Sequence, residues 1–205
     1  FFPGSGVLLQ RELGLDGKIA AMDIRNACSG FIYALSVADQ FIKTGMYNNV
    51  LVVGAEIQST ALDISTRGRN TAVIFGDGAG AVVLQPANSP GILSTHLHSD
   101  GHFAEELYVK DPGSSRPHNE RQPDQILDTS TYKVVMNGNQ VFKHAVVRFM
   151  EVINEALRAN NLQRTDINLL VPHQANLRIS QYIQEKLELS NGQVYNNIMR
   201  YGNTT

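Results

Sequence analysis

The strongest constraint on the fold of this chain is a strand, a helix and a second strand that follow one another between residues 20 and 55. The run Ala20–Arg25 is predicted to be a strand, and the apolar residues of Ser29–Thr44 recur at helical spacing up to a stop at Gly45. Asn49–Ala55 is a continuous Val/Leu run, which is typical of a strand covered on both faces. Strands that alternate with helices in this way indicate an α/β layered fold.

The second half of the chain continues the alternation. Apolar residues at every third or fourth position predict one long amphipathic helix over Val141–Leu157. The sequence of Asp100–Thr131 is polar and contains several prolines, so it predicts a long loop. Shorter patterns predict helices at 7–13 and 177–187 and strands at 71–75, 81–84, 91–99, 169–171 and 194–196.

Composition excludes several classes of partner. There are 17 basic and 19 acidic residues, so the formal net charge of -2 favours neither nucleic acid nor a membrane surface. No apolar run approaches the ~20 residues that a bilayer-spanning helix needs. The single cysteine cannot form an internal disulfide, which suits the reducing cytoplasm. Because the sequence opens on Phe-Phe-Pro and stops at Gly-Asn-Thr-Thr, we expect an internal segment of a longer protein.

Cys28 is the first candidate for chemistry, because it lies between the predicted strand that ends near Arg25 and the predicted helix that starts near Ser29. At a helix N-terminus, unpaired backbone N–H groups and the helix dipole favour the thiolate over the thiol. The alternative is that Cys28 is a buried and inert apolar residue, as lone cysteines usually are. Position alone leaves both interpretations open.

His173 and Asn203 are two further candidates. His173 lies in the run VPHQAN, after a predicted strand and before a predicted helix, where α/β folds assemble their sites. Asn203 lies in a Gly-Asn turn of the run YGNTT. Each has a structural alternative, since histidines commonly cap helices and asparagines commonly occupy turns. A nucleophilic thiolate commonly works with a histidine and a third polar group, so the three residues together favour catalysis.

Three other features receive structural interpretations. The run Gly76–Gly80 is similar to a dinucleotide-binding loop, but a predicted strand follows it instead of a helix, so we predict a hairpin turn. His96, His98 and His102 are close in sequence without a further group of ligands, so we predict no metal site. The basic side chains on the predicted helices are most simply solvated; they are Lys143, Arg148, Arg178 and Lys186.

Five runs of the sequence are specific enough together to suggest a family. They are DIRNACSGFIYALSVADQFIKTG around Cys28, FGDGAGAVVL at 75–84, STHLHSDG at 94–101, VPHQANLRI at 171–179 and YGNTT at the end. In this order they closely resemble the β-ketoacyl-[acyl carrier protein] synthase III family, over nearly the whole chain except the proline-rich loop. The resemblance implies a thiolase-like α/β fold with layers α/β/α/β/α, incomplete at both ends. Residues 1–87 would belong to its N-terminal half and residues 88–205 to its C-terminal half.

The resemblance implies a decarboxylative condensation that initiates fatty acid synthesis. In this family a cysteine accepts an acyl group from acyl-coenzyme A, and malonyl-acyl carrier protein then loses carbon dioxide. The carbanion attacks the thioester and gives β-ketoacyl-carrier protein. By resemblance Cys28 is the nucleophile, while His173 and Asn203 suit the role of hydrogen-bond donors to the enolate oxygen. The coenzyme A thioester is a substrate, and neither a cofactor nor a metal is implied.

The resemblance also implies binding residues and a homodimer. The residues that would line the coenzyme A tunnel are Arg67, Gly138, Phe142 and Asn176. Lys143 and Arg178 would form a basic rim that meets the acidic carrier protein. Phe2 would reach into the acyl pocket of the partner subunit. Gln58 stands where an apolar pocket residue is usual, and the sequence does not specify the acyl chain.

Three alternatives stay open from the sequence. A related condensing enzyme of polyketide or quinolone-type biosynthesis would carry the same Cys-His-Asn set. A cysteine hydrolase would share the order of these residues, but its usual Cys-Gly-Ser-Cys-Trp context is missing, because the sequence has one cysteine and no tryptophan. An inactive fragment is the third alternative, and acylation of Cys28 would distinguish it from an enzyme.

Overall fold

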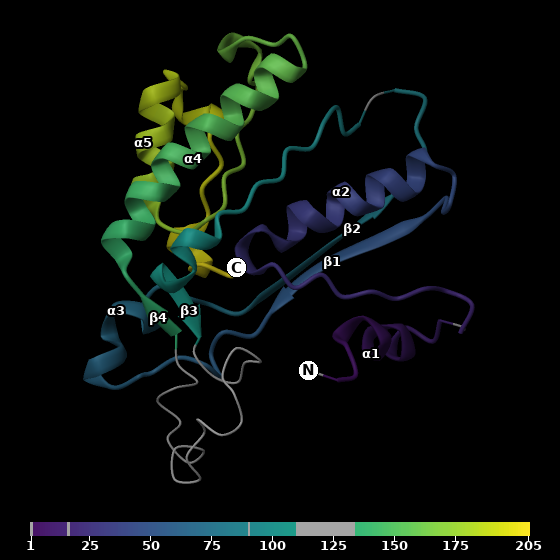
Figure 1. The fold of residues 1–205 in the computed structure, drawn as a ribbon, viewed down its shortest axis with the longest axis horizontal. Helices are drawn as coiled ribbons and strands as arrows, with labels where there is room; N and C mark the ends of the chain where they lie inside the picture. The colour runs from purple at the N-terminus through teal and green to yellow at the C-terminus, as the bar shows by residue number, and fades with distance from the viewer. Residues whose placement is uncertain (1, 16, 90, 110–133) are drawn as a thin grey trace. The chain divides into compact units, whose positions relative to one another are not determined.

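The computed structural model describes residues 2–15, 17–89, 91–109 and 134–205 (Figure 1). The chain groups into two compact units. The first unit comprises Phe1–Val52 and Val83–Pro86, and the second comprises Val53–Val82 and Ala87–Thr205. The division expected after residue 87 concerns the two halves of the family's fold and stays a prediction.

Two helices of the first unit lie where the sequence predicts them. α1 spans Ser5–Glu12, and α2 spans Gly30–Lys43 after the 3-10 turn Ala27–Ser29. Just beyond α2, Gly45 has a positive φ of 72°, a conformation that side chains other than glycine rarely tolerate. Both helices are therefore confirmed, and a glycine stops the second as expected.

The strand predicted at Ala20–Arg25 is wrong. Residues 20–26 belong to no helix or strand, and no other described segment pairs with them. A strand needs a neighbour that bonds its N–H and C=O groups. Side chains hold the segment to α1 instead, because Gly6 N–H donates to Asp23 Oδ1 at 2.8 Å and Gln10 Nε2 donates to the carbonyl of Ile19 at 2.7 Å.

The strand predicted at Asn49–Ala55 is confirmed. It forms β1, Val50–Glu56, which pairs in a two-stranded sheet with β2, Gly78–Leu84. The division between the two units runs through both strands. Beside the sheet, Gln85 Nε2 donates to Asn49 Oδ1 at 2.5 Å, which joins the residue after β2 to the residue before β1.

The hairpin predicted around Gly76–Gly80 is wrong. Arg69–Ala72 forms the short helix α3, after the 3-10 turn Thr66–Gly68, and β2 begins inside the glycine run. Glycine is needed there for a different reason, since a Cβ at Gly76 would overlap the carbonyl oxygen of Tyr201. The run therefore permits the close approach of a distant segment.

The core of the second unit lies between α4, Gly138–Ala159, and α5, Leu177–Leu187, which pack side by side (Figure 1). Both helices confirm the prediction. Asn176 caps α5 by accepting from Arg178 N–H at 3.0 Å, and the helix ends at Glu188 in the left-handed region. The buried core residues are Ile179, Ile183, Leu187, Leu189 and Val194, with Phe142, Val146, Phe149 and Ile153 of α4 against them. Burying an aliphatic side chain of this kind typically contributes about 1.5–3 kcal/mol to the free energy of unfolding.

Part of the segment predicted as a loop at Asp100–Thr131 has regular structure. A 3-10 segment spans Gly101–Glu106, and β3, Leu107–Val109, follows it directly. β3 pairs antiparallel with β4, Val134–Met136. The loop prediction is therefore wrong for residues 101–109, and residues 110–131 lie outside the described residues.

The strands predicted at 91–99, 169–171 and 194–196 are wrong, because none of these segments pairs with another described segment over several residues. Residues 92–99 form neither helix nor strand. Leu170 and Val194 make one isolated parallel bridge, so the last two segments are neighbours but pair over a single position. The mixture of helices and strands confirms the α/β class. Among the described helices, none is both long and apolar enough to cross a bilayer.

Candidate active site

Cys28 lies at the centre of the turn Ala27–Ser29, which leads into α2. Ala27 has a positive φ of 45°, a conformation that costs a non-glycine residue about 1–3 kcal/mol, so the backbone turns sharply just before the cysteine. Asn26 fixes the turn, because its Nδ2 donates to Ser29 Oγ at 2.8 Å and its carbonyl accepts from Ser29 N–H at 3.3 Å. The half-buried thiol thus precedes the first turn of α2, where the sequence predicts it.

His173 carries a polar atom that nothing in the described chain satisfies. Burial lowers the pKa of His173 below its ordinary value of 6.5, so the ring is neutral near neutral pH. Its Nε2 is buried and has no hydrogen-bond partner among the described residues. Such an atom typically costs about 1–3 kcal/mol and is rare in native structures. A neutral imidazole with an unpaired buried nitrogen is suited to bonding a reacting group.

Asn203 is buried, with 4% of its surface exposed. Its backbone is held on both sides of Phe75, because its N–H donates to Ile74 at 2.8 Å and its carbonyl accepts from Gly76 N–H at 2.9 Å. The side-chain Oδ1 accepts from Thr205 N–H at 2.9 Å. This bond identifies the oxygen end of the amide, so the NH2 group is the end that can donate to a substrate.

Glycines allow the Asn203 segment to lie against the start of β2. Gly202 has a positive φ of 69°, and a Cβ there would lie 2.9 Å from the carbonyl oxygen of Ile74. A Cβ at Gly78 would lie 2.8 Å from the side chain of Thr204. Gly76 and Gly78, which the sequence assigned to a hairpin turn, therefore let the residues on either side of Asn203 approach the start of β2 closely.

The three candidate catalytic residues are divided between the two units. His173 and Asn203 belong to the second unit and Cys28 belongs to the first. Gln174, next to His173, bonds the segment that leads toward Asn203, so the structure links those two loops. The convergence of both residues on the sulfur of Cys28 stays a prediction.

Arg67 is fixed by a carboxylate that the sequence analysis missed. Asp63 Oδ2 accepts from Arg67 Nε at 2.7 Å; the Asp63 side chain is 12% exposed and that of Arg67 69%. Hydrogen bonds from Ser65 and then from Arg67 lower the pKa of Asp63 to about 2, so the pair stays charged at neutral pH. The bond uses Nε, and the terminal nitrogens of Arg67 can therefore face an anion. Spacing of i, i+4 between acid and base is the signal that could have found the pair.

Gly138, Phe142 and Asn176 also have defined local roles. Gly138 begins α4, and a Cβ there would meet the side chain of Met136 at 3.9 Å, an ordinary contact. Phe142 stands one turn later and packs in part against the core. Asn176 caps α5 through its Oδ1, so its NH2 group is the part of the side chain that can meet a ligand.

Lys143 and Arg178 are exposed on α4 and α5. Neither makes an ion pair within the described part of the chain, whereas Arg148 of α4 pairs with Glu151 at 2.7 Å. Phe2, in the first unit, is 99% exposed. These three side chains are accessible, as binding to a carrier protein or to a second subunit requires.

The three histidines near position 100 contact carboxylates. His96 Nδ1 lies 3.1 Å from Glu155 Oε1, and His98 Nε2 lies 2.6 Å from Glu155 Oε2, so one carboxylate of α4 holds both rings. His102 Nδ1 lies 2.9 Å from Asp100 Oδ1. Within the described ranges, no group of three or more metal-binding side chains has an arrangement suited to an ion.

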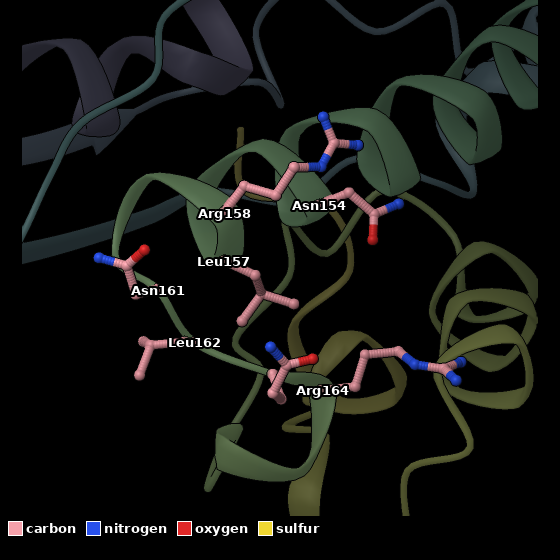
Figure 2. A pocket seen from close by; sticks show the side chains of 7 residues that line it. Asn154, Leu157, Arg158, Asn161, Leu162 and Arg164 are labelled. Carbon is pink, nitrogen blue, oxygen red and sulfur yellow. The ribbon is translucent and has the colours of Figure 1, made fainter.

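A hollow of about 390 Å³ lies at the C-terminal end of α4 (Figure 2). Polar side chains surround Leu157 there, and Arg158 and Arg164 are among them. None of the residues that the sequence predicts for the site lines this hollow. It is therefore separate from the candidate active site.

Comparison with known proteins gives the chain's relatives. Residues 22–101 match the family described as 3-oxoacyl-[acyl-carrier-protein (ACP)] synthase III, and residues 157–205 match the family of its C-terminal part. A curated β-ketoacyl-[acyl-carrier-protein] synthase III of Methylococcus capsulatus is 44% identical over 204 residues, which are 100% of this chain and 60% of that protein. The chain thus spans about 60% of the length of the curated relatives it matches.

Solved structures share the fold. The crystal structure of β-ketoacyl-[acyl carrier protein] synthase III from Thermus thermophilus is 39% identical with a TM-score of 0.86, and the match covers 100% of this chain and 60% of that one. The priming β-ketosynthase of the R1128 polyketide biosynthetic pathway is 33% identical with a TM-score of 0.81, over 97% of this chain and 57% of that one. These neighbours confirm the predicted thiolase-like fold class.

Proposed function

Because this chain belongs to the β-ketoacyl-[acyl carrier protein] synthase III family, we propose that the complete protein condenses an acyl group from acyl-coenzyme A with malonyl-acyl carrier protein. The product is β-ketoacyl-carrier protein, which starts fatty acid synthesis. The observation that carries the proposal is the buried Nε2 of His173, which lacks a partner in the described chain. Its ring is neutral, and the Asn203 amide presents its NH2 group in the same unit.

The first half-reaction is thioester exchange on Cys28. The thiolate attacks the acyl carbonyl of acyl-coenzyme A, a new C–S bond forms, and the coenzyme A thiolate leaves. A thiolate suits this step because it is both a good nucleophile and a good leaving group. The position of Cys28 ahead of α2 supports the assignment, since the N–H groups of the first helical turn favour an anion there.

The second half-reaction is decarboxylation followed by C–C bond formation. The bond between the malonyl carboxylate and its α-carbon breaks, carbon dioxide leaves, and the electron pair enters an enolate. We assign His173 and Asn203 as N–H donors to the enolate oxygen, and each such donor is typically worth about 3–4 kcal/mol. The α-carbon then attacks the acyl-cysteine carbonyl, and the Cys28 thiolate leaves.

The remaining predicted residues are assigned to substrate binding. Arg67, held by Asp63, would bind an anionic part of coenzyme A, with Gly138, Phe142 and Asn176 along the same tunnel. Lys143 and Arg178 would meet the acidic carrier protein, which their exposure and lack of ion pairs in the described chain support. No cofactor is assigned.

The active form is proposed to be a cytoplasmic homodimer. Phe2 is 99% exposed, so its side chain is accessible to a second subunit, as this proposal requires. Sedimentation of the complete protein at micromolar concentration would check the dimer, and a stable monomer would exclude it.

A second candidate function has support from one observation. The structural likeness to a priming β-ketosynthase of polyketide biosynthesis, at 33% identity, makes a polyketide starter condensation the main alternative. Such an enzyme would use the same Cys-His-Asn chemistry with a different acyl donor or carrier protein. The choice of acceptor distinguishes the two functions.

The deciding experiment measures the two half-reactions separately in the complete protein. Mass spectrometry follows the adduct on Cys28 with a panel of acyl-coenzyme A donors, and carbon dioxide release follows the turnover of malonyl-carrier protein. Cys28→Ala should abolish the adduct, and His173→Ala should keep much of the adduct while losing decarboxylation. An adduct that survives in Cys28→Ala would remove Cys28 from the mechanism. A wild-type protein that forms no adduct would exclude the proposed function and favour an inactive chain.

A further inference from the structure

We infer that Gln174 is a positioning residue, which fixes the loop of His173 to the segment that carries Asn203. The inference rests on the proposed function, because it concerns how the two enolate donors keep their arrangement. Gln174 lies directly after His173, and its side chain bonds four backbone groups on both sides of the site. It does not itself need to contact a substrate.

The amide nitrogen of Gln174 holds two carbonyl groups. Its Nε2 donates to the carbonyl of Pro172 at 3.0 Å and to the carbonyl of Tyr195 at 3.1 Å. The first bond closes a small ring around the backbone of His173, since Pro172 and Gln174 are its two neighbours. The second bond ties this ring to a segment about twenty residues later in the chain. Both hydrogens of the amide are therefore used.

The amide oxygen of Gln174 caps the helix that precedes Asn203. Its Oε1 accepts from Asn197 N–H at 2.9 Å and from Ile198 N–H at 3.1 Å. These are the N–H groups of the N-cap residue and of the first residue of α6, Ile198–Tyr201, and the N-cap residue, Asn197, makes no side-chain cap of its own. Because the first N–H groups of a helix lack intrahelical partners, Gln174 supplies what α6 otherwise lacks.

The capped helix α6 leads directly to Asn203. After Tyr201 the chain turns at Gly202, whose N–H donates to Ile198 at 2.9 Å, and Asn203 follows at once. A rotation or shift of α6 would therefore move Asn203 on its contacts with Ile74 and Gly76. One side chain thus fixes the position of His173 and, through one helical turn, the position of Asn203.

Only an amide can make all four bonds. A glutamine offers two donor hydrogens on nitrogen and two acceptor lone pairs on oxygen, and each of the four is used here. A glutamate would still accept from the two N–H groups, but its second oxygen would face two carbonyl oxygens. A methionine of similar length would make none of the bonds.

A second glutamine provides a matched control. Gln193 Nε2 donates to the carbonyl of Ile167 at 2.7 Å, and its Oε1 accepts from Ser190 N–H at 3.0 Å and Ser190 Oγ at 2.9 Å. It joins segments of the same unit with a similar number of bonds, but none of them involves the residues adjoining His173 or Asn203. Gln193→Met therefore measures the loss of stability that follows when the hydrogen bonds of such a glutamine are removed.

The test compares Gln174→Met, Gln174→Glu and Gln193→Met in the complete protein. Gln174→Met should leave acylation of Cys28 nearly unchanged and lower the rate constant of decarboxylation by about 10²-fold, since a misplacement of about 1 Å has that effect. The KM for malonyl-carrier protein should change little. Both Gln174→Met and Gln193→Met should lower the melting temperature, by similar amounts. Gln193→Met should nevertheless leave both half-reactions intact.

The pH profile of Gln174→Glu gives a readout that a purely structural role would not produce. Protonation of the new carboxyl group restores a donor toward one carbonyl, so the decarboxylation rate relative to wild type should rise as pH falls. Gln174→Met should show a flat ratio over the same range. A flat ratio for both variants, or a parallel loss of both half-reactions in Gln174→Met and Gln193→Met, would overturn the inference.

Hydrogen exchange separates this inference from the proposed function. In Gln174→Met the amides of residues 171, 173–175 and 197–203 should exchange faster together, and in Gln193→Met they should keep their protection. If the wild-type protein performs no condensation but this joint exchange is seen, the link between the loops stands and the proposed function fails. Unchanged exchange in both segments would overturn the link itself.

Discussion

The side-chain oxygen of Asn203 accepts a hydrogen bond from the backbone N–H of Thr205 at 2.9 Å. The amide is therefore oriented by its own chain before any substrate arrives, with its NH2 group as the available donor. A donor that is fixed in advance stabilises a developing oxyanion without the cost of reorganisation in the transition state.

Exchange of Asn203→Asp tests this orientation. The carboxylate keeps an acceptor for Thr205 N–H but replaces the NH2 donor with a charged oxygen that repels the enolate. We expect acylation of Cys28 to continue and carbon dioxide release to fall by at least about 10²–10³-fold. Asn154→Asp, in the hollow at the end of α4, controls for the added charge. A double variant with His173→Ala should lose less than the product of the single losses, because both donors serve one oxygen.

The burial of His173 predicts a specific dependence of stability on pH. Its pKa is lowered in the folded protein, so between that value and the unfolded value near 6.5 the unfolded chain binds the proton more readily. Relative to His173→Gln, the wild-type protein should lose free energy of unfolding as pH falls below 6.5. Above that pH the difference should be constant. Urea unfolding at a series of pH values measures it, and a difference that does not change with pH would argue against a buried neutral ring.

Gly76→Ala tests the close approach between β2 and the Asn203 segment. The new Cβ would overlap the backbone carbonyl of Tyr201, which cannot move aside as a flexible side chain can. We expect a loss of about 1–3 kcal/mol in the free energy of unfolding, together with slower decarboxylation. Gly80→Ala is the matched control, because a Cβ there would meet no atom within 4 Å. Equal effects of the two exchanges would mean that the contact with Tyr201 is unimportant.

Asp63→Asn should weaken the binding of acyl-coenzyme A. The exchange removes the charge that fixes the Arg67 guanidinium, so the KM for the thioester should rise several-fold with little change in kcat. Because the pKa of Asp63 is about 2, the wild-type pair stays ionised and its effect should not vary across neutral pH. Glu151→Gln, which breaks the Arg148 pair on α4, is the control and should leave this KM unchanged. A similar rise in both variants would point to a general charge effect.

Charge reversal at Lys143 and Arg178 should weaken the carrier protein interaction. Both cations are exposed without ion pairs in the described chain, so an acidic partner can meet them. Lys143→Glu with Arg178→Glu should raise the KM for malonyl-carrier protein at low salt, and added salt should reduce the difference from wild type. Arg158→Glu, at the far end of α4, should have no such effect. An unchanged KM would leave the two residues as solvated helix positions.

The elements that the sequence predicted best are those whose apolar pattern and terminal signals lie within the element itself. α2 and α5 fall within one residue of their predicted ends, because their apolar spacing and terminal signals lie inside the helices themselves. β1 followed from a continuous Val/Leu run for the same reason. The strands expected at Ala20–Arg25 and 91–99 failed, because a strand exists only where a second segment bonds to it, and composition does not reveal that partner.

The candidate site divides in a similar way. Residue type and position next to predicted elements were enough to select Cys28, His173 and Asn203. The bonds of Gln174 could not be read from the sequence, since a glutamine that bonds backbone groups about twenty residues apart leaves no local pattern. Asp63 differs, because its i, i+4 spacing from Arg67 is a local signal. The sequence predicted a hairpin turn at Gly76 and Gly78 because the residues that lie against them, Tyr201 and Thr204, are more than one hundred residues away in the chain.

The hydrogen bonds that Gln174 Oε1 accepts from the N–H groups of Asn197 and Ile198 close a loop of chain that contains the whole of α5. The core residues Ile183 and Leu187 lie within that loop. Both ends of the loop are therefore joined beside the same packed interior, and we expect them to open together with it while the Gln174 bonds are present. Heat inactivation of decarboxylation should accordingly coincide with melting of this core, without an earlier local transition at the two loops.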